Sequence, residues 1–354
     1  MSIPKTHYFT AIMEPKVATM HEEPLPEMGS DDVLLKMEAC NICTTDYQQW
    51  MGLRNHQGFP MAGGHEWSGI VCAKGENVEN VEIGDRVAPL FMGCGHCKAC
   101  LMGKSFCCES KEGGWPVRDG FHGDRGFSDY KVFPKNKVLK MSKNISAAEA
   151  GFLEPVATVV RGMKRLRVKP GETVVVIGAG TMGLLNAQVA KAFGAHVIIS
   201  ELTPKKLERA AAMGFAEIVD AKNGDPVEQV KQLTDGKGAD AVIAAVGHSV
   251  AYRQGMEMLK QLEGRFLLFA AGYPVPEFQI NPNDVHYRRI EIIGTMSADV
   301  EDYVDAGFMI SNKIVDCSYS LEGKTFALKD IQEAFAAAAT PDTYRITVDL
   351  QGVK

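Results

Sequence analysis

The chain has 354 residues, 45% hydrophobic and 23% charged, a composition typical of a globular protein long enough for two domains. Its net charge of −6 gives no indication of a nucleic-acid or anionic-membrane partner. No apolar stretch is long enough to span a membrane and the first residues lack the apolar core of a signal peptide, so we expect a cytoplasmic protein. The nine cysteines are then expected to be reduced thiols or metal ligands rather than disulfides.

Residues 1–150 have the pattern of a β-rich domain with long loops. Short runs that alternate hydrophobic and polar residues are separated by glycine, proline, asparagine and aspartate. The clearest runs are Asp32–Met37, Ser68–Ala73 and Asp129–Phe133. A helical pattern over Glu149–Arg165 follows and leads to a turn at 169–171.

A cluster of cysteines with metal-ligand spacing lies in this part of the chain, at about 92–110. The four cysteines are Cys94, Cys97, Cys100 and Cys108. Four thiolates so close in sequence can close a tetrahedron around Zn²⁺, and a closed site of this kind is structural. Cys107 competes for the fourth position because it adjoins Cys108, and His96 is a weaker competitor.

The stretch Gly171–Leu202 has the pattern of a strand, a helix and a second strand. Between the first strand and the helix lies Gly-x-Gly-x-x-Gly at Gly178, Gly180 and Gly183. These glycines permit a tight turn, close approach of the backbone to a pyrophosphate, and close packing of helix on strand. In this βαβ setting they predict a dinucleotide site rather than a glycine turn without a nucleotide.

Two further features bear on the coenzyme. The first turn of the helix, at Thr181 and Met182, directs unpaired N–H groups at the phosphates. Glu201 follows Gly178 by 23 residues, where a carboxylate can accept hydrogen bonds from a ribose 2′-OH and would repel a 2′-phosphate, so NAD is favoured over NADP. Lys205 and Lys206 weaken this preference, since either could contact a 2′-phosphate.

Strand and helix patterns alternate from residue 171 onward. The predicted strands are 173–177, 196–200, 216–220, 240–246, 265–270 and 290–295. The predicted helices are 181–193, 204–213, 225–234 and 249–261. Six strands joined by helices predict an α/β fold with a doubly wound six-stranded parallel sheet, the Rossmann arrangement.

The last part of the chain is short for a third domain. It contains an alanine-rich helical pattern over Ala327–Ala339 and an alternating segment, Tyr344–Leu350, that predicts an edge strand. We expect it to return to the first domain, which is then discontinuous. The predicted organisation is a catalytic domain over 1–157, a nucleotide-binding domain over 158–295 and the return to the catalytic domain over 296–354.

Two short motifs near the start, Cys-Thr-Thr-Asp at 43–46 and Gly-His-Glu at 64–66, prove little alone, because a buried cysteine and a core histidine explain them more simply. Their order along the chain changes this, since the whole chain resembles the zinc-dependent medium-chain alcohol and polyol dehydrogenases. The other matching motifs are GDRV at 84–87, the four-cysteine lobe, GFSDY at 126–130, Glu-Pro at 154–155 and GAGTMG at 178–183. The resemblance implies a GroES-like fold for the β-rich domain.

The resemblance implies a catalytic zinc site in this domain. Cys43 and His65 match its ligands, and Asp46 matches a carboxylate that orients the ligating histidine. Glu154 stands where alcohol dehydrogenases have a second cysteine, as in the sorbitol dehydrogenase branch. Either Glu154 or Glu66 can then be the third protein ligand, and the sequence does not separate the two.

Other residues acquire roles in the same way. Thr45 matches a hydroxyl that bonds the substrate oxygen, and Thr158 matches a residue that packs against the nicotinamide. Arg345 matches a basic residue that approaches either the coenzyme phosphates or the glutamate after the histidine. The chain departs from many relatives at two positions. It has Thr44 where they have a glycine, and Gln48 where they have a histidine that relays the proton.

The expected function is transfer of a hydride from a secondary alcohol of a polyol or sugar-derived substrate to NAD, giving a ketone. Zinc would lower the pKa of the bound hydroxyl from about 16 towards 7. Two zinc ions per chain, one catalytic and one structural, and a homo-oligomer, tetramer or dimer, are expected. The alternatives are a threonine, butanediol or simple secondary alcohol dehydrogenase and, from another class, a non-catalytic nucleotide-binding protein.

Overall fold

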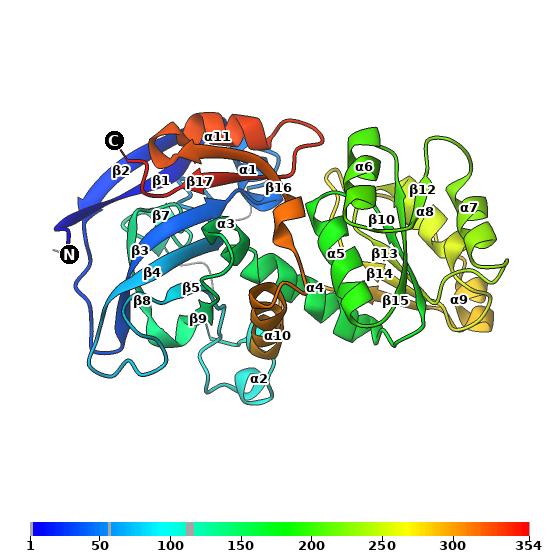
Figure 1. Cartoon of the computed structure of the whole chain (residues 1–354), viewed down its shortest axis with the longest axis horizontal. Helices are drawn as coiled ribbons and strands as arrows, with labels where there is room; N and C mark the ends of the chain where they lie inside the picture. The colour runs from blue at the N-terminus through cyan, green and yellow to red at the C-terminus, as the bar shows by residue number, and fades with distance from the viewer. Residues whose placement is uncertain (1–2, 56–57, 111–116, 354) are drawn as a thin grey trace. The chain divides into compact units, whose positions relative to one another are not determined.

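The computed structural model describes residues 3–55, 58–110 and 117–353 (Figure 1). The chain divides into two compact units. The first comprises Met1–Ala157, Ala298–Lys313 and Leu321–Lys354, and the second comprises Thr158–Ser297 and Ile314–Ser320. The return of 314–320 to the second unit was not predicted. Within the described ranges, no helix is both long and apolar enough to cross a membrane.

The second unit is built on a six-stranded parallel sheet. Its strands are β10 (Thr173–Ile177), β11 (His196–Glu201), β12 (Glu217–Asp220), β13 (Ala241–Ala244), β14 (Arg265–Leu268) and β15 (Glu291–Gly294). They lie in the order β12-β11-β10-β13-β14-β15, so the chain moves outward from β10 first on one side and then on the other. Because parallel crossovers are right-handed, this reversal puts helices on both faces. The predicted doubly wound sheet is confirmed.

One helix leads into the first strand of this unit, and the others connect its strands. They are α4 (Leu153–Leu166), which the two units share, α5 (Thr181–Ala192), α6 (Pro204–Ala212), α7 (Pro226–Leu233), α8 (Ser249–Met258) and α9 (Pro282–Arg288). Helix α9 was not predicted, although its sequence carries a start signal: the Asn281 side chain caps the helix and Pro282 occupies its first turn. The core is apolar on both sides of the sheet: the register partners Val175 and Val242 are buried on one face, and Val176 and Ile243 on the other.

The first unit is built on a sheet of seven strands. They are β3 (Asp32–Asn41), β4 (Glu66–Lys74), β5 (Arg86–Pro89), β8 (Tyr130–Pro134), β9 (Val138–Met141), β16 (Leu321–Ala327) and β17 (Arg345–Asp349). The order is β16-β17-β3-β4-β5-β9, and β8 pairs with β3. Two smaller pairs join β1 (Thr6–Glu14) to β2 (Val17–Pro24) and β6 (Val117–Arg118) to β7 (Phe121–His122).

The helices of the first unit are short. They are α1 (Thr44–Trp50), α2 (Lys98–Leu101), α3 (Ala147–Ala150), α10 (Val300–Ser311) and α11 (Ile331–Ala338). The helix predicted over 149–165 is interrupted at Gly151, where an added Cβ would lie 2.6 Å from the carbonyl oxygen of Glu66. This close approach carries the start of α4, with Glu154, toward the beginning of β4.

The segment predicted as an edge strand lies inside the sheet, so that prediction is wrong. Strand β17 is parallel to β16 on one side and antiparallel to β3 on the other. Two of its polar side chains, Arg345 and Thr347, are buried rather than facing solvent, and Thr347 donates a hydrogen bond of 2.9 Å to Asn41. Strand β16 had not been predicted, because its sequence Leu-Glu-Gly-Lys-Thr-Phe-Ala is polar and contains a glycine.

The glycines between β10 and α5 differ in what surrounds them. Gly178 has a φ of +98°, which favours glycine. A Cβ at Gly183 would overlap the carbonyl oxygen of Gly178, whereas a Cβ at Gly180 would meet nothing within 4 Å. The third glycine is therefore required for packing of the unit itself, and the second is not.

This difference predicts that two alanine substitutions change the stability of the unit by very different amounts. Gly183→Ala should destabilise the second unit by about 3 kcal/mol, because the added methyl group forces the helix away from the loop. Gly180→Ala should change stability by less than about 1 kcal/mol, since the space beside it is open. Thermal unfolding of both variants measures this, and equal loss in the two would contradict it.

Candidate active site

The first part of the site lies on α1. Cys43 precedes the helix as its N-cap, and Asp46 occupies its first turn. The buried Asp46 carboxylate accepts a hydrogen bond of 3.0 Å from the backbone N–H of Cys43 and one of 3.3 Å from that of Gly64. Asp46 thus holds together the two segments that carry the predicted metal ligands.

His65 follows Gly64 and lies beside the same carboxylate. Its Nδ1 is 3.8 Å from Oδ1 of Asp46. Burial alone would lower the pKa of His65, but the negative charges of Asp46, Cys43 and Glu154 raise it well above its ordinary value. The same negative charges that favour a proton on this imidazole also favour a divalent cation beside it. A metal ion would take the place of that proton, because it binds the neutral ring.

Three predicted ligands come together at this point. Ligand atoms of Cys43, His65 and Glu66 lie within 4.8 Å of one another. A thiolate, an imidazole and a carboxylate are the donor types that zinc binds in catalytic sites. Glu154, half-buried in the first turn of α4, is outside this set, but its charge acts on His65.

Glu66 is paired with Arg345. The two side chains form a bidentate ion pair, with nitrogen–oxygen distances of 2.9 and 2.8 Å, and both are buried. Strands β4 and β17 reach this contact because both pair with β3, where Asn41 is opposite Glu66 and Thr347. Of the two positions that the resemblance allowed for Arg345, the structure places it against the glutamate.

The same guanidinium reaches the start of α1. Its Nη2 is 3.4 Å from Sγ of Cys43, and its Nη1 donates to the hydroxyl of Thr44 at 3.5 Å. Glu66 and Cys43 raise the pKa of Arg345 above its usual range, although burial opposes the charge. The threonine at position 44, noted above as a departure from many relatives, is therefore a partner of this arginine.

Thr45, the predicted substrate-binding hydroxyl, is half-buried on α1. It accepts a hydrogen bond of 3.1 Å from Nη1 of Arg54. Spacing alone does not connect these two residues, because they are nine positions apart across the end of a helix.

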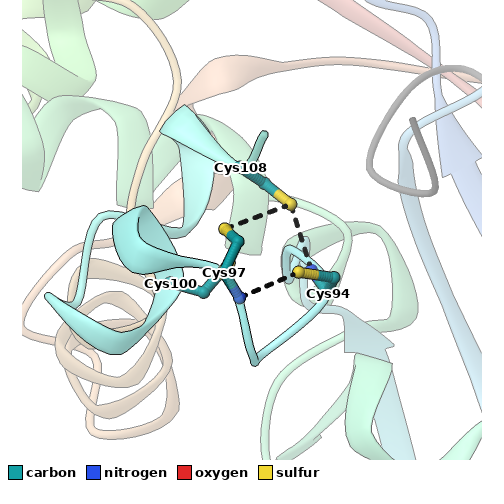
Figure 2. Close-up of side chains that lie close together, drawn as sticks. All are labelled: Cys94, Cys97, Cys100 and Cys108. Atoms are coloured by element: carbon teal, nitrogen blue, oxygen red, sulfur yellow. Dashed lines mark hydrogen bonds between the residues drawn. The ribbon is translucent and has the colours of Figure 1, made fainter. Parts of the chain in front are cut away.

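The four cysteines of the lobe converge as predicted for one ion. Ligand atoms of Cys94, Cys97, Cys100 and Cys108 lie within 4.8 Å of one another. Figure 2 shows the sulfur atoms of Cys97 and Cys108 close together, at 4.0 Å. Four sulfurs bound to zinc at about 2.3 Å are about 3.8 Å apart, so this spacing fits. Cys107 and His96, the competing residues, are exposed and outside the set.

Proton affinities differ within this cluster. Hydrogen bonds from the backbone of Glu109 and Cys100 lower the pKa of Cys97 to about 6. A backbone N–H of Gly95 favours the Cys100 thiolate, but burial and the hydrogen bonds with the other thiols outweigh it and raise the pKa of Cys100 to about 12. The crowded thiols share protons, and a divalent cation would replace them.

A buried carboxylate links the lobe to the start of α10 in the first unit. Asp299, buried just before α10, accepts hydrogen bonds from the Ser105 hydroxyl at 3.4 Å and from the backbone N–H of Phe106 at 3.1 Å. Leu101 and Met102, in the lobe itself, are exposed. Few apolar contacts hold the lobe, which is the situation in which a metal ion contributes folding energy.

The predicted coenzyme residues lie at one end of the sheet in the second unit. Gly180 is the N-cap of α5 and offers no capping side chain, and Thr181 and Met182 form the first turn. The buried Glu201 carboxylate accepts hydrogen bonds of 2.6 Å from the Ala179 N–H, and of 2.7 and 2.8 Å from the two residues after it. Glu201 therefore also fixes the glycine loop.

Two other predicted coenzyme residues lie on helices α4 and α6. Thr158 is half-buried on α4, and Lys206 is half-buried on α6. Lys205, its neighbour, is exposed.

Comparison with known proteins identifies the family. A model described as "Zinc-binding dehydrogenase" matches residues 181–311, and one described as "Alcohol dehydrogenase GroES-like domain" matches residues 29–143. An L-threonine 3-dehydrogenase of Bacillus subtilis (strain 168) is 31% identical over 330 residues, 90% of this chain and 91% of that protein. The chain belongs to the zinc-dependent medium-chain alcohol/polyol dehydrogenases.

Other relatives cover the chain equally well. A sorbitol dehydrogenase of Halalkalibacterium halodurans is 28% identical over 334 residues, 92% of this chain and 94% of that protein. A solved structure, described as a zinc-binding dehydrogenase from Sinorhizobium meliloti 1021 bound to NADP, has a TM-score of 0.86 and 25% identity. The match covers 98% of this chain and all of that one. The family is thus shown, and its members differ in substrate.

The buried pair in this dehydrogenase predicts a double-mutant result. Arg345→Met leaves the Glu66 carboxylate buried without its cation, which should cost about 3–5 kcal/mol. The double variant Arg345→Met, Glu66→Gln should lose less than Arg345→Met alone, because no charge remains unpaired. Chemical denaturation at matched zinc content measures the four free energies; additive losses would contradict the prediction.

Proposed function

We propose that this dehydrogenase oxidises a secondary alcohol of a polyol or sugar-derived substrate to a ketone, with NAD as the hydride acceptor. The observation that carries the proposal is the convergence of Cys43, His65 and Glu66, with Glu154 close enough for its charge to act on His65. A protein that only bound nucleotides would have no need for this donor set. A glutamate at position 154 and a sorbitol dehydrogenase among the relatives favour a polyol.

Zinc bound here would supply Lewis acidity that lowers the pKa of the alcohol. Cys43 and His65 would hold the ion, and Asp46 orients the imidazole. Glu66 lies in the same donor set but is paired through both oxygens with Arg345, so we assign it to the surroundings of the ion and the third protein ligand to Glu154. Thr45 would bond the substrate oxygen. Gln48 cannot titrate, so proton release would end on water or another group.

NAD is the proposed coenzyme because Glu201 is buried at the end of β11 with its charge beside the glycine loop. The negative charge of a 2′-phosphate at this position would repel that of the Glu201 carboxylate. The three backbone hydrogen bonds hold the carboxylate in place, so it would not turn away. A solved structure at 25% identity is described as bound to NADP, so membership of the family does not by itself decide between the coenzymes. Lys205 and Lys206 are the two basic residues that would favour the phosphate.

The rival activity with a specific observation behind it is oxidation of threonine, because a relative at 31% identity bears that name. Butanediol and simple secondary alcohols are further possibilities. A non-catalytic nucleotide-binding protein is the alternative of a different class. Metal content separates that alternative from the enzyme, and a substrate panel separates the activities.

We expect about two zinc ions per chain, one in each donor set. Cys43→Ala should remove one ion and the activity while the lobe ion remains. Cys97→Ala should remove the other and lower the unfolding temperature, since the lobe has few apolar contacts of its own. Metal analysis of the purified variants measures this. One ion that survives Cys43→Ala and disappears in Cys97→Ala would leave only a structural site.

The substrate is tested with polyols, polyol phosphates, threonine, 2,3-butanediol and simple secondary alcohols, each with NAD and with NADP. We expect the highest kcat/KM on a polyol or sugar-derived alcohol, and a preference for NAD of at least about tenfold. Glu201→Ala should reduce that preference, with Glu208→Ala, an exposed residue on α6, as control. Best turnover on threonine or on a simple alcohol would overturn the polyol assignment.

A further inference from the structure

We propose that Lys131 is a positioning residue for the metal site: it holds the loop at 122–127, and that loop fixes the backbone from which His65 extends. The inference rests on the proposed function, because it takes His65 to be a ligand of the catalytic zinc. It is carried by a continuous path of hydrogen bonds and backbone contacts from Lys131 to the residues before His65.

Lys131 is anchored in the sheet of the first unit. It lies on β8, which pairs with β3 and places Lys131 opposite Leu35. Its side chain is buried, and Nζ lies 5.2 Å from the ring centre of Trp67 and 4.5 Å from that of Phe133. An ammonium group over two aromatic rings is attracted to both faces. The sheet and the two rings therefore fix the position of the Lys131 charge.

This ammonium group holds both the backbone and the side chain of Asp124. Nζ of Lys131 donates to the backbone carbonyl oxygen of Asp124 and, at 2.7 Å, to Oδ2 of its carboxylate. The loop needs such a hold, because Gly123 has a φ of +104° and Arg125 a φ of +50°. A residue with a side chain keeps a positive φ only where its surroundings hold it there. Lys131 thus ties a strained loop to the sheet.

The loop lies along the segment that leads to the histidine ligand. The backbone N–H of Arg125 donates to the carbonyl oxygen of Ala62 at 2.9 Å. The N–H of Gly126 donates to the carbonyl oxygen of Gly63, also at 2.9 Å. At the next position the two backbones touch, since a side chain at Gly126 would overlap the carbonyl oxygen of Gly64. A shift of the loop would therefore move this segment with it.

His65 is consequently held from two directions. Oδ1 of Asp46 accepts a hydrogen bond of 3.3 Å from the N–H of Gly64 and lies 3.8 Å from Nδ1 of His65. The loop tied by Lys131 supports the same segment through its carbonyl groups. A buried ion pair is weak evidence for stability, because apolar side chains of similar volume often serve as well. What the pair of Lys131 and Asp124 adds is a fixed backbone beside a metal ligand.

Metal binding is sensitive to such a position. A zinc–nitrogen bond is about 2.0–2.1 Å long and tolerates a deviation of about 0.2 Å. Removing a group that orients a ligand without touching the ion costs about 10- to 100-fold in metal affinity or activity. We expect a loss of this size when Lys131 no longer holds the loop.

Lys131→Met tests the proposal, because methionine has a similar length but cannot bind Asp124. The zinc affinity of the site that contains Cys43 and His65 should fall about 10- to 100-fold, while the affinity of the cysteine lobe stays unchanged. Competition with a chelator measures both ions, and Cys43→Ala identifies the one in the lobe. With cobalt(II) in place of zinc, the visible absorption of the Cys43 site should change as well.

Two further variants separate positioning from general destabilisation. Arg86→Met breaks another half-buried ion pair of the same sheet, in which Arg86 binds Glu38 at 2.7 and 3.0 Å. It should destabilise the unit and leave both zinc affinities and the cobalt spectrum unchanged. Asp124→Asn keeps the backbone acceptor, so it should fold and lose less than about tenfold. Equal losses of affinity in Lys131→Met and Arg86→Met would overturn the proposal, and so would unchanged affinity in both Lys131→Met and Asp124→Asn.

Hydrogen exchange supplies a readout that does not depend on the metal or on turnover. The amides of Arg125 and Gly126, which donate to the segment before His65, should exchange faster in Lys131→Met than in the wild type or Arg86→Met. Failure of the proposed function is distinguishable: the wild type then binds zinc only in the lobe and oxidises no alcohol, while the faster exchange still appears. Unchanged exchange of these amides would overturn the role assigned to Lys131.

Discussion

The ion pair between Glu66 and Arg345 joins three parts of the first unit that are distant in the sequence. Arg345 comes from β17 near the end of the chain, Glu66 begins β4, and the same guanidinium contacts Cys43 at the start of α1. A buried carboxylate and a buried guanidinium are costly unless each satisfies the other. The pairing therefore restricts how the C-terminal segment can return to the sheet, and it fixes the residue that adjoins His65. The discontinuous first unit and the geometry of its donor set depend on this one contact.

The second unit was the part of the fold that sequence patterns predicted best. Its central strands are apolar on both faces, as in β10, and helices with their own start residues alternate with the strands. Gly183 shows why the pattern is informative: a side chain there would overlap the carbonyl oxygen of Gly178, so the sequence reports a constraint of the backbone itself. Local signals suffice when the structure they specify is local.

The first unit was less predictable because its decisive contacts are between distant residues. In β17, Arg345 and Thr347 alternate with apolar residues, which is typical of an edge strand, yet both are buried because Glu66 and Asn41 are their partners. The donor residues themselves were found through the order of motifs along the chain. Which carboxylate pairs with Arg345, and that Arg54 reaches Thr45, depends on strand order and on a turn after α1, and neither can be read from spacing.

The two donor sets differ in a way that matches different roles. The lobe brings together four thiols of one loop. As thiolates they would occupy all four positions of a tetrahedral ion, so that no position is left for a substrate. The other set combines Cys43, His65 and a carboxylate from separate elements, and two arginines lie beside it. One arginine is matched by Glu66 within the protein. The other donates to Thr45, the hydroxyl proposed to hold the substrate oxygen. Four thiols close in one loop suit an ion with a structural role, whereas donors drawn from separate elements leave a zinc ion a position for a substrate oxygen.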